Sequence, residues 1–208
     1  MNLFSERNSL KDKVACLLVL IILSAIVYFN SLKGAFQFDD RNLLNKEWLA
    51  DLNSFKKGVG LKSIPERPIL LWTLAANNHL DNKNTFGFHL VNLNIHILVT
   101  ILIFTILIRI KNLISKNDSY INNKQNNVLI FPFVTSLIFA LHPLNTDSVA
   151  YISSRSSLLA TFFFLLTLYC FSETLLFSRT IKYRTIIGLL IIPGIYLAVA
   201  SKLIAITL

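Results

Sequence analysis

Long apolar runs alternate with short polar segments along this chain of 208 residues. The runs cover residues 14–30, 88–110, 128–142, 158–177 and 185–200. A helix of about 20 predominantly apolar residues spans the hydrocarbon core of a bilayer, and the third run is short by that measure. The pattern predicts an all-α, polytopic integral membrane protein with about five transmembrane helices.

The amino-terminal 13 residues are polar, and Arg7, Lys11 and Lys13 stand just before the first apolar run. A cleaved signal peptide is the alternative to a retained helix. The first run is long for such a peptide, and residues 29–33 offer no small-x-small cleavage site. We therefore expect a retained first span with a cytoplasmic amino terminus.

Basic residues favour the same orientation. The segments assigned to the cytoplasmic side carry ten Lys and Arg residues against three acidic ones. The opposite segments carry the other ten, but eight of these lie in residues 31–87, a loop close to the length of about 60 residues at which the positive-inside rule weakens.

Composition supports a membrane protein and argues against a nucleic-acid-binding one. Hydrophobic residues make up 54% of the chain and charged residues 15%, whereas soluble domains have about 25% charged residues. The net charge is +9, but most basic residues flank apolar blocks, as topology signals do. We expect the lipid bilayer to be a partner and nucleic acid not to be one.

The loop of residues 31–87 is the longest polar segment. Leu44, Trp48, Leu52 and Phe55 recur on one face of a helix, which predicts an interfacial helix that ends at Gly58 or Gly60. A second short helix is expected to begin at Arg67-Pro68, since Pro is favoured in a first turn.

The adjacent carboxylates Asp39 and Asp40 follow the first span directly. Phe36 and Phe38 alternate with them, a setting in which a partly desolvated Asp can act as a general base. Solvated loop acids are the alternative. A divalent cation is another, since histidines occur nearby, but no ligand spacing supports a metal site and no other cofactor is implied.

Polar residues in other segments are expected on the same side of the membrane as Asp39. In the second span His89, Asn92 and His96 are spaced i, i+3, i+7 on one helical face, where they either line a cavity or hold helices together. The remaining candidates on that side are Arg67, His142, the segment 145–155 and Lys202.

The segment after His142 predicts a helix boundary. Pro143 stops the third helix, and Asn145 or Thr146 caps the next, with Asp147 in its first turn. Arg155 then lies four residues after Tyr151. An ordinary surface helix has this pattern, and so does a helix that presents Arg155 to a phosphate.

These residues together resemble a known family. The motifs that carry the resemblance are Phe38-Asp39-Asp40 with Asn45, Arg67-Pro68, 88–92 with His96, 139–143 through 149–152 with Arg155, and Ser201-Lys202. They cover about residues 36–207 and resemble the transmembrane and tetratricopeptide-repeat O-mannosyltransferases and their bacterial relatives, within the GT-C superfamily of glycosyltransferases.

The resemblance implies a GT-C-like helical bundle whose first external loop holds the catalytic acid. Its members transfer a mannose-like hexose from a polyprenyl-phosphate donor to a Ser/Thr or glycan hydroxyl with inversion. It assigns Asp39 as the base with Asp40 beside it. Residues assigned to the donor phosphate or the substrate are Arg67, His89, Asn92, His142, Arg155 and Lys202.

Three positions depart from the family pattern. Asn145 replaces His or Gln, Asp147 replaces Glu, and Leu203 replaces an acid. The chain also stops at Leu208, where family members continue, so we expect the front part of the membrane module.

Two other functions are open to such a chain. One is a non-catalytic membrane relative that binds lipid or a protein partner. The other is a small transporter, which needs charges inside the spans, where only Glu173 qualifies. Both a bacterial inner membrane and the endoplasmic reticulum membrane are compatible with the sequence.

Overall fold

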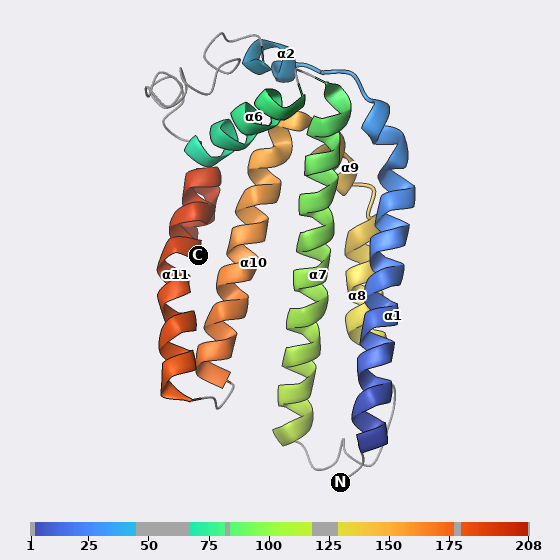
Figure 1. Cartoon of the computed structure of the whole chain (residues 1–208), viewed down its shortest axis with the longest axis vertical. Coiled ribbons are helices and arrows are strands. Elements are labelled where there is room, and N and C mark those ends of the chain that lie inside the picture. Colours follow the sequence, from blue (N-terminus) through green and yellow to red (C-terminus); the bar gives the residue numbers. More distant parts are fainter. Residues whose placement is uncertain (1–2, 45–66, 82–83, 118–128, 177–179, 208) are drawn as a thin grey trace.

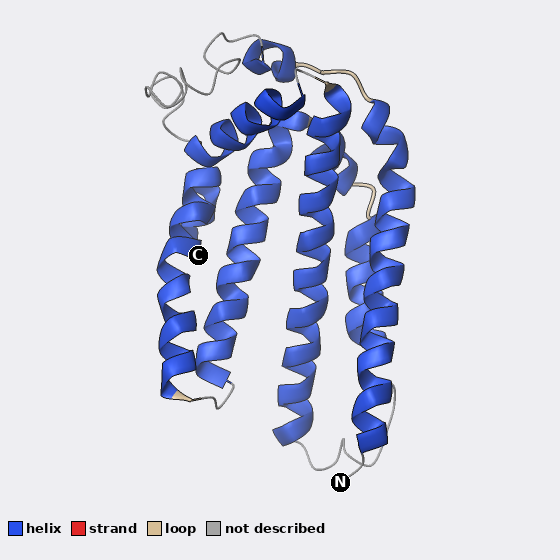
Figure 2. Ribbon diagram, in the orientation of Figure 1, coloured by secondary structure: helices blue, strands red, loops and turns tan. Residues whose placement is uncertain are grey.

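The computed structural model describes residues 3–44, 67–81, 84–117, 129–176 and 180–207. Helices joined by short connections make up this part of the chain, and none of it forms a strand (Figure 2). The chain is an all-α protein, as the sequence predicts.

Five helices of the described part form the body of a bundle (Figure 1). They are α1 (Leu3–Tyr28), α7 (Thr85–Asn117), α8 (Ile130–Leu141), α10 (Arg155–Leu176) and α11 (Ile181–Ser201). The first three pack together on one side, and α10 and α11 pair on the other. Because α7 contacts both α8 and α10, it is the central helix.

Four helical segments of the described residues are long and apolar enough to cross a bilayer, namely Leu10–Lys33, Thr85–Ile114, Ile152–Thr174 and Ile181–Ser201. The fifth, α8, has 12 residues, which at 1.5 Å per residue is about 18 Å. Large apolar side chains such as Ile22 on α1 and Ile192 on α11 face outward. The chain is a multi-pass membrane protein.

Short elements cover one end of the bundle. The helix α6 (Pro68–Asp81) lies across that end, where η1 (Phe29–Lys33), α2 (Asp39–Leu44), α9 (Asn145–Ala150) and η3 (Ile152–Ser154) also gather (Figure 1). Buried leucines of α6, including Leu71 and Leu74, pack against Phe88 and Ile152. The predicted helix at Arg67-Pro68 is therefore present and has a structural role. The interfacial helix predicted over residues 44–57 falls, from residue 45 on, outside the described residues.

The connection between α8 and α10 differs from the predicted capping pattern. Leu144 precedes α9, and no side chain caps that helix. Nδ2 of Asn145 instead donates a hydrogen bond to the carbonyl oxygen of Phe139 (2.6 Å), so it satisfies a carbonyl at the end of α8. Asp147 does lie in the first turn of α9. The prediction that Asn145 or Thr146 caps the following helix is wrong.

The predicted i, i+4 relation of Tyr151 and Arg155 within one helix is also wrong. The helix α9 ends at Ala150, Tyr151 is extended, and Arg155 begins α10 after the single turn η3. The break turns the chain so that η3 faces α2.

The carboxyl end of α11 turns back on the bundle. Lys202 is extended, and η4 (Leu203–Thr207) follows it and packs against α11. Small side chains make this close approach feasible, since Ala160, Ala198 and Ala205 form one buried cluster. Lys202 is consequently held beside the start of α10.

Candidate functional site

The two adjacent carboxylates lie in different environments. Asp39 is exposed at the start of α2, whereas Asp40 is 1% exposed. Oδ1 of Asp40 accepts hydrogen bonds from the backbone N–H (2.8 Å) and the hydroxyl (2.6 Å) of Ser153. Its Oδ2 accepts from the N–H groups of Gln37 (3.3 Å) and Ile152 (3.4 Å). Within the described part of the chain, no hydrogen bond or ion pair engages the carboxylate of Asp39.

The polar face of α7 is fully buried and binds backbone carbonyls of neighbouring segments. His89, Asn92 and His96 are each 0% exposed. Their ring or amide nitrogens lie 3.1–3.3 Å from backbone carbonyl oxygens. These oxygens belong to the residue that follows η1, to α9 and the residue after it, and to α8. The acceptors are the carbonyl oxygens of Gly34, Val149, Tyr151 and Ala140. In this geometry the three side chains hold segments together, the second of the two roles predicted for them.

Arg155 is buried in a network of protein acceptors. Its Nε donates to Oδ1 of Asn92 (2.7 Å), and Nη2 donates to Oδ1 of Asn77 (2.9 Å) and the carbonyl oxygen of Phe88 (3.0 Å). Nη1 donates to the carbonyl oxygen of Thr73 (3.3 Å). The side chain is 0% exposed, so direct contact with a donor phosphate would require this network to open. The geometry gives Arg155 the role of joining α6, α7 and α10.

The other basic residues predicted for the site are Arg67, Lys202 and His142. Arg67 is half-buried just before α6, whose start lies over the carboxyl end of α11 (Figure 1). Lys202 is half-buried, and its Nζ donates to the hydroxyl of Ser157 (2.8 Å). His142 is exposed, and its Nδ1 accepts from the N–H of Leu144 (3.2 Å). Among the described residues, neither Arg67 nor His142 hydrogen-bonds to another predicted site residue.

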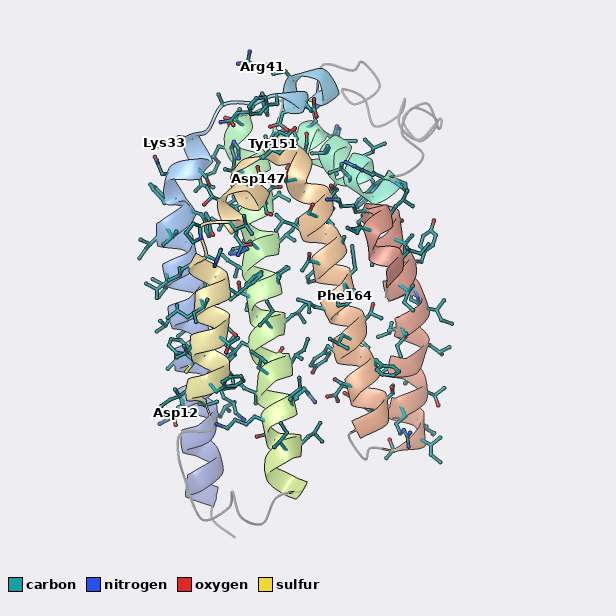
Figure 3. All side chains as sticks on the ribbon, turned by 180° about the vertical axis from the view of Figure 1, so that it is seen from behind. Asp12, Lys33, Arg41, Asp147, Tyr151 and Phe164 are labelled. Carbon is teal, nitrogen blue, oxygen red and sulfur yellow. The ribbon has the colours of Figure 1, made fainter. Side chains whose placement is uncertain are left out.

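Seen from behind, the labelled Lys33, Arg41, Asp147 and Tyr151 all lie at this end, and Asp12 lies toward the opposite end (Figure 3). Separate segments come together at α6, which contacts α7, α10 and α11. The helix α8 instead contacts α9, and α2 contacts η3.

Two contributors were missed by sequence reasoning. The hydroxyl of Ser153 donates a hydrogen bond to Asp40. Ser153 is one of several nearby serines, and nothing in the sequence distinguishes it from the others. Oδ1 of Asn77 accepts a hydrogen bond from Arg155. Here the sequence does carry a signal, because Asn77 and Asn78 interrupt an otherwise apolar helical segment. Both asparagines are buried, as polar residues inside such a segment require partners.

The opposite end of the bundle holds a separate polar contact and a cavity. Glu173 is fully buried and pairs with Arg109, which also donates to the hydroxyl of Tyr169 (2.7 Å). A cavity of about 280 Å³ between α7 and α10 adjoins this pair. Its lining residues are Ile106, Arg109, Ile110, Leu113, Leu168, Phe171 and Ser172. The pairing of Glu173 does not support the transporter hypothesis, because the charge is already balanced by a neighbour.

No group of three or more His, Cys, Asp or Glu side chains that could hold a metal ion occurs among the described residues. The site is best described as an exposed carboxylate, Asp39, next to a buried one, Asp40, at one end of a bundle of apolar helices. This defines a class of multi-pass membrane protein with a polar site at one end of its helical bundle.

Comparison with known proteins identifies the family. Protein O-mannosyl-transferase F38B6.6 of Caenorhabditis elegans is 30% identical over 164 residues, covering 73% of this chain and 22% of that protein. Protein O-mannosyl-transferase TMTC1 of Homo sapiens is 30% identical over 165 residues, covering 73% and 17%. Protein O-mannosyl-transferase Tmtc3 of Drosophila melanogaster is 30% identical over 182 residues, covering 77% and 19%.

The chain belongs to the family of transmembrane and tetratricopeptide-repeat protein O-mannosyl-transferases. It spans about a fifth of the length of these relatives. No protein-family model matches the chain. No solved structure is significantly similar to it.

Proposed function

We propose that this chain carries the catalytic carboxylate of a GT-C-type glycosyltransferase. The reaction moves a mannose-like hexose from a polyprenyl-phosphate donor to a hydroxyl of a protein Ser/Thr or a glycan. The observation that carries the proposal is the difference in environment between two neighbouring carboxylates. Asp39 is exposed, whereas Asp40 is buried and accepts hydrogen bonds from Ser153. The names of the relatives support O-mannosyl transfer to protein as the reaction class.

The proposed chemistry is a single displacement. Asp39 accepts the proton of the acceptor hydroxyl while that oxygen attacks the anomeric carbon. The new carbon–oxygen bond forms as the bond to the lipid phosphate breaks, and the phosphate leaves with the electron pair. Attack from the face opposite the leaving phosphate inverts the anomeric configuration.

Basic residues predicted for the site stabilise the departing phosphate in this scheme. Arg67, His142 and Lys202 are exposed or half-buried, so a phosphate can reach them without unfolding the bundle. Preorganised positive charge of this kind stabilises charge that develops in the transition state. His89, Asn92 and Arg155, which are buried, contribute by fixing the segments that carry the exposed groups.

The test is transfer of mannose from a defined polyprenyl-phosphate donor by the protein reconstituted in vesicles. Asp39→Asn removes the proton acceptor but keeps the shape of the side chain, so kcat is expected to fall about 10²–10⁴-fold. The matched control is Asp12→Asn, an exposed carboxylate at the other end of the bundle, which should transfer like the wild type.

Full activity of Asp39→Asn would end the assignment of the base. A wild-type protein that binds the donor but transfers nothing would favour the alternative, a non-catalytic membrane relative that binds lipid or a protein partner.

A further inference from the structure

The backbone just before the two carboxylates adopts an unusual conformation. Phe38 has φ of 43°, in the left-handed region that a bulky residue rarely occupies. Its side chain is 83% exposed, so burial of the ring does not explain the conformation. A strained residue persists only where its surroundings fix the backbone, and such residues cluster at functional sites.

Contacts on both sides of Phe38 fix the turn. Nε of Arg41 donates to the carbonyl oxygen of Phe36 (3.1 Å), and the N–H of Gln37 donates to Asp40 (3.3 Å). These contacts close the turn locally. The link to the distant segment is made by three hydrogen bonds that Asp40 accepts, two from Ser153 and one from the N–H of Ile152.

The ring of Phe38 also meets this distant segment. It lies edge-to-face against Tyr151, with ring centroids 6.4 Å apart. Residues 151–153 therefore contact the turn at two places, once through an aromatic pair and once through the buried carboxylate. Neither contact involves Asp39.

We infer that Asp40 is a positioning residue and that Ser153 is its partner, together forming a clasp that sets the orientation of Asp39. The inference rests on the proposed function. Successive residues of a helix are rotated by about 100° around its axis, so drawing Asp40 into the bundle turns Asp39 outward. The clasp thus keeps one carboxylate buried so that the other is held at a fixed place toward the substrates.

A substitution at Ser153 weakens the clasp and leaves both carboxylates in place. Ser153→Ala removes the hydroxyl bond of 2.6 Å and leaves the backbone bonds from Ser153 (2.8 Å) and Ile152 (3.4 Å). The expected result is a fall of about tenfold in kcat, a size typical of a misplaced catalytic group, with little change in KM. Ser153→Thr keeps a hydroxyl and should restore most of the rate.

A matched control lies one residue away. The hydroxyl of Ser154 bonds to Asp147 (3.3 Å) rather than to Asp40. Ser154→Ala should leave kcat unchanged. A merely local disturbance of η3 would instead lower the rate of both alanine variants.

A second measurement does not depend on transfer activity. Hydrogen exchange of the peptide covering residues 36–44 should be faster in Ser153→Ala and in Asp40→Ala than in the wild type, and unchanged in Ser154→Ala. The double variant Asp40→Ala, Ser153→Ala should lower kcat no further than Asp40→Ala alone, because Asp40→Ala already removes the acceptor of the Ser153 hydroxyl.

The outcomes separate the two claims. An active wild type with unchanged kcat in Ser153→Ala overturns the positioning role and leaves the proposed function standing. Unchanged hydrogen exchange in Asp40→Ala overturns the clasp itself. A wild type that transfers nothing overturns the proposed function and the positioning role with it, even where the exchange data show the clasp intact.

Discussion

The guanidinium of Arg155 shows how a single residue organises the candidate-site end of the bundle. Its hydrogen bonds reach two side chains and two backbone carbonyls on α6 and α7. It also lies over the ring of Phe88, with 5.6 Å between the guanidinium carbon and the ring centroid. The planar fork of Arg suits this arrangement, because its donors point in several fixed directions.

Lysine cannot replace this fork. Arg155→Lys keeps the charge but supplies one ammonium group, so some of the acceptors on Thr73, Asn77, Phe88 and Asn92 lose their donor inside the bundle. A buried polar group left without a partner costs about 1–3 kcal/mol. We expect a lower midpoint of thermal unfolding in detergent, measured by intrinsic fluorescence.

The control for this prediction is Arg184→Lys, since Arg184 is exposed near the start of α11. Its unfolding midpoint should match that of the wild type. An equal midpoint for Arg155→Lys would mean that the network around Arg155 adds nothing to stability.

At the scale of elements, α10 and α11 form the most extensive helix pair of the described bundle. The helix α11 continues through Pro193, which lacks the N–H that the preceding turn would receive. Gly194 follows and meets α10 directly, since a Cβ built there would overlap Oγ1 of Thr167. Small residues permit this close approach of two helices, as is common in membranes.

Two glycines of α11 give a matched pair of variants. Gly194→Ala forces α11 away from Thr167 and should lower the unfolding midpoint. Gly188→Ala meets only Cγ2 of Thr174 at 3.8 Å, an ordinary contact, and Ala is favoured over Gly by about 1 kcal/mol in a helix interior. We expect Gly188→Ala to unfold at or above the wild-type midpoint. Equal destabilisation by both would contradict the importance of the Gly194 contact.

The helices were predictable from sequence, and the pairing of side chains was not. Apolar runs reveal each long helix because burial in lipid requires continuous apolar length. By contrast, Asp39 and Asp40 are adjacent and chemically identical, so only the contact with Ser153, far along the chain, distinguishes them. The resemblance assigns Arg155 to the donor phosphate or the substrate, but the sequence does not show that Asn77 and Asn92 accept hydrogen bonds from its guanidinium.

The break after α9 explains the wrong boundaries nearby. Residues 145–155 fit a single helix by composition, yet the chain bends at Tyr151, where Asn92 binds the carbonyl oxygens of Val149 and Tyr151 (both 3.3 Å). The bend coincides with this tertiary contact. A prediction from local propensity cannot include a contact between residues so far apart in the sequence.

At the scale of the whole molecule, the two ends of the bundle differ in chemistry. The end with α2 and α6 carries the candidate site, and the other end carries the carboxyl end of α10 and the start of α11 (Figure 1). From the positive-inside rule we predict that the candidate site faces away from the cytoplasm. The exposed residues Asp12 and Lys33 lie near the two ends of the apolar segment Leu10–Lys33 (Figure 3).

Labelling with a membrane-impermeant maleimide tests this orientation. In a background of Cys16→Ala and Cys170→Ala, Lys33→Cys should react from outside the intact cell or, for an endoplasmic reticulum protein, only after the lumen is opened. Asp12→Cys should show the opposite accessibility. The reverse pattern would place the candidate site on the cytoplasmic side.

The contacts of Arg155 and Asp40 also set an order of assembly during synthesis. The four acceptors of Arg155 lie on residues 73, 77, 88 and 92, so all of them leave the ribosome before the guanidinium that they bind. Asp40, in contrast, is made 113 residues before Ser153. The turn that carries Asp39 therefore acquires its final shape only once the start of α10 has reached the bundle. The candidate base is therefore synthesised well before the segment that fixes its position.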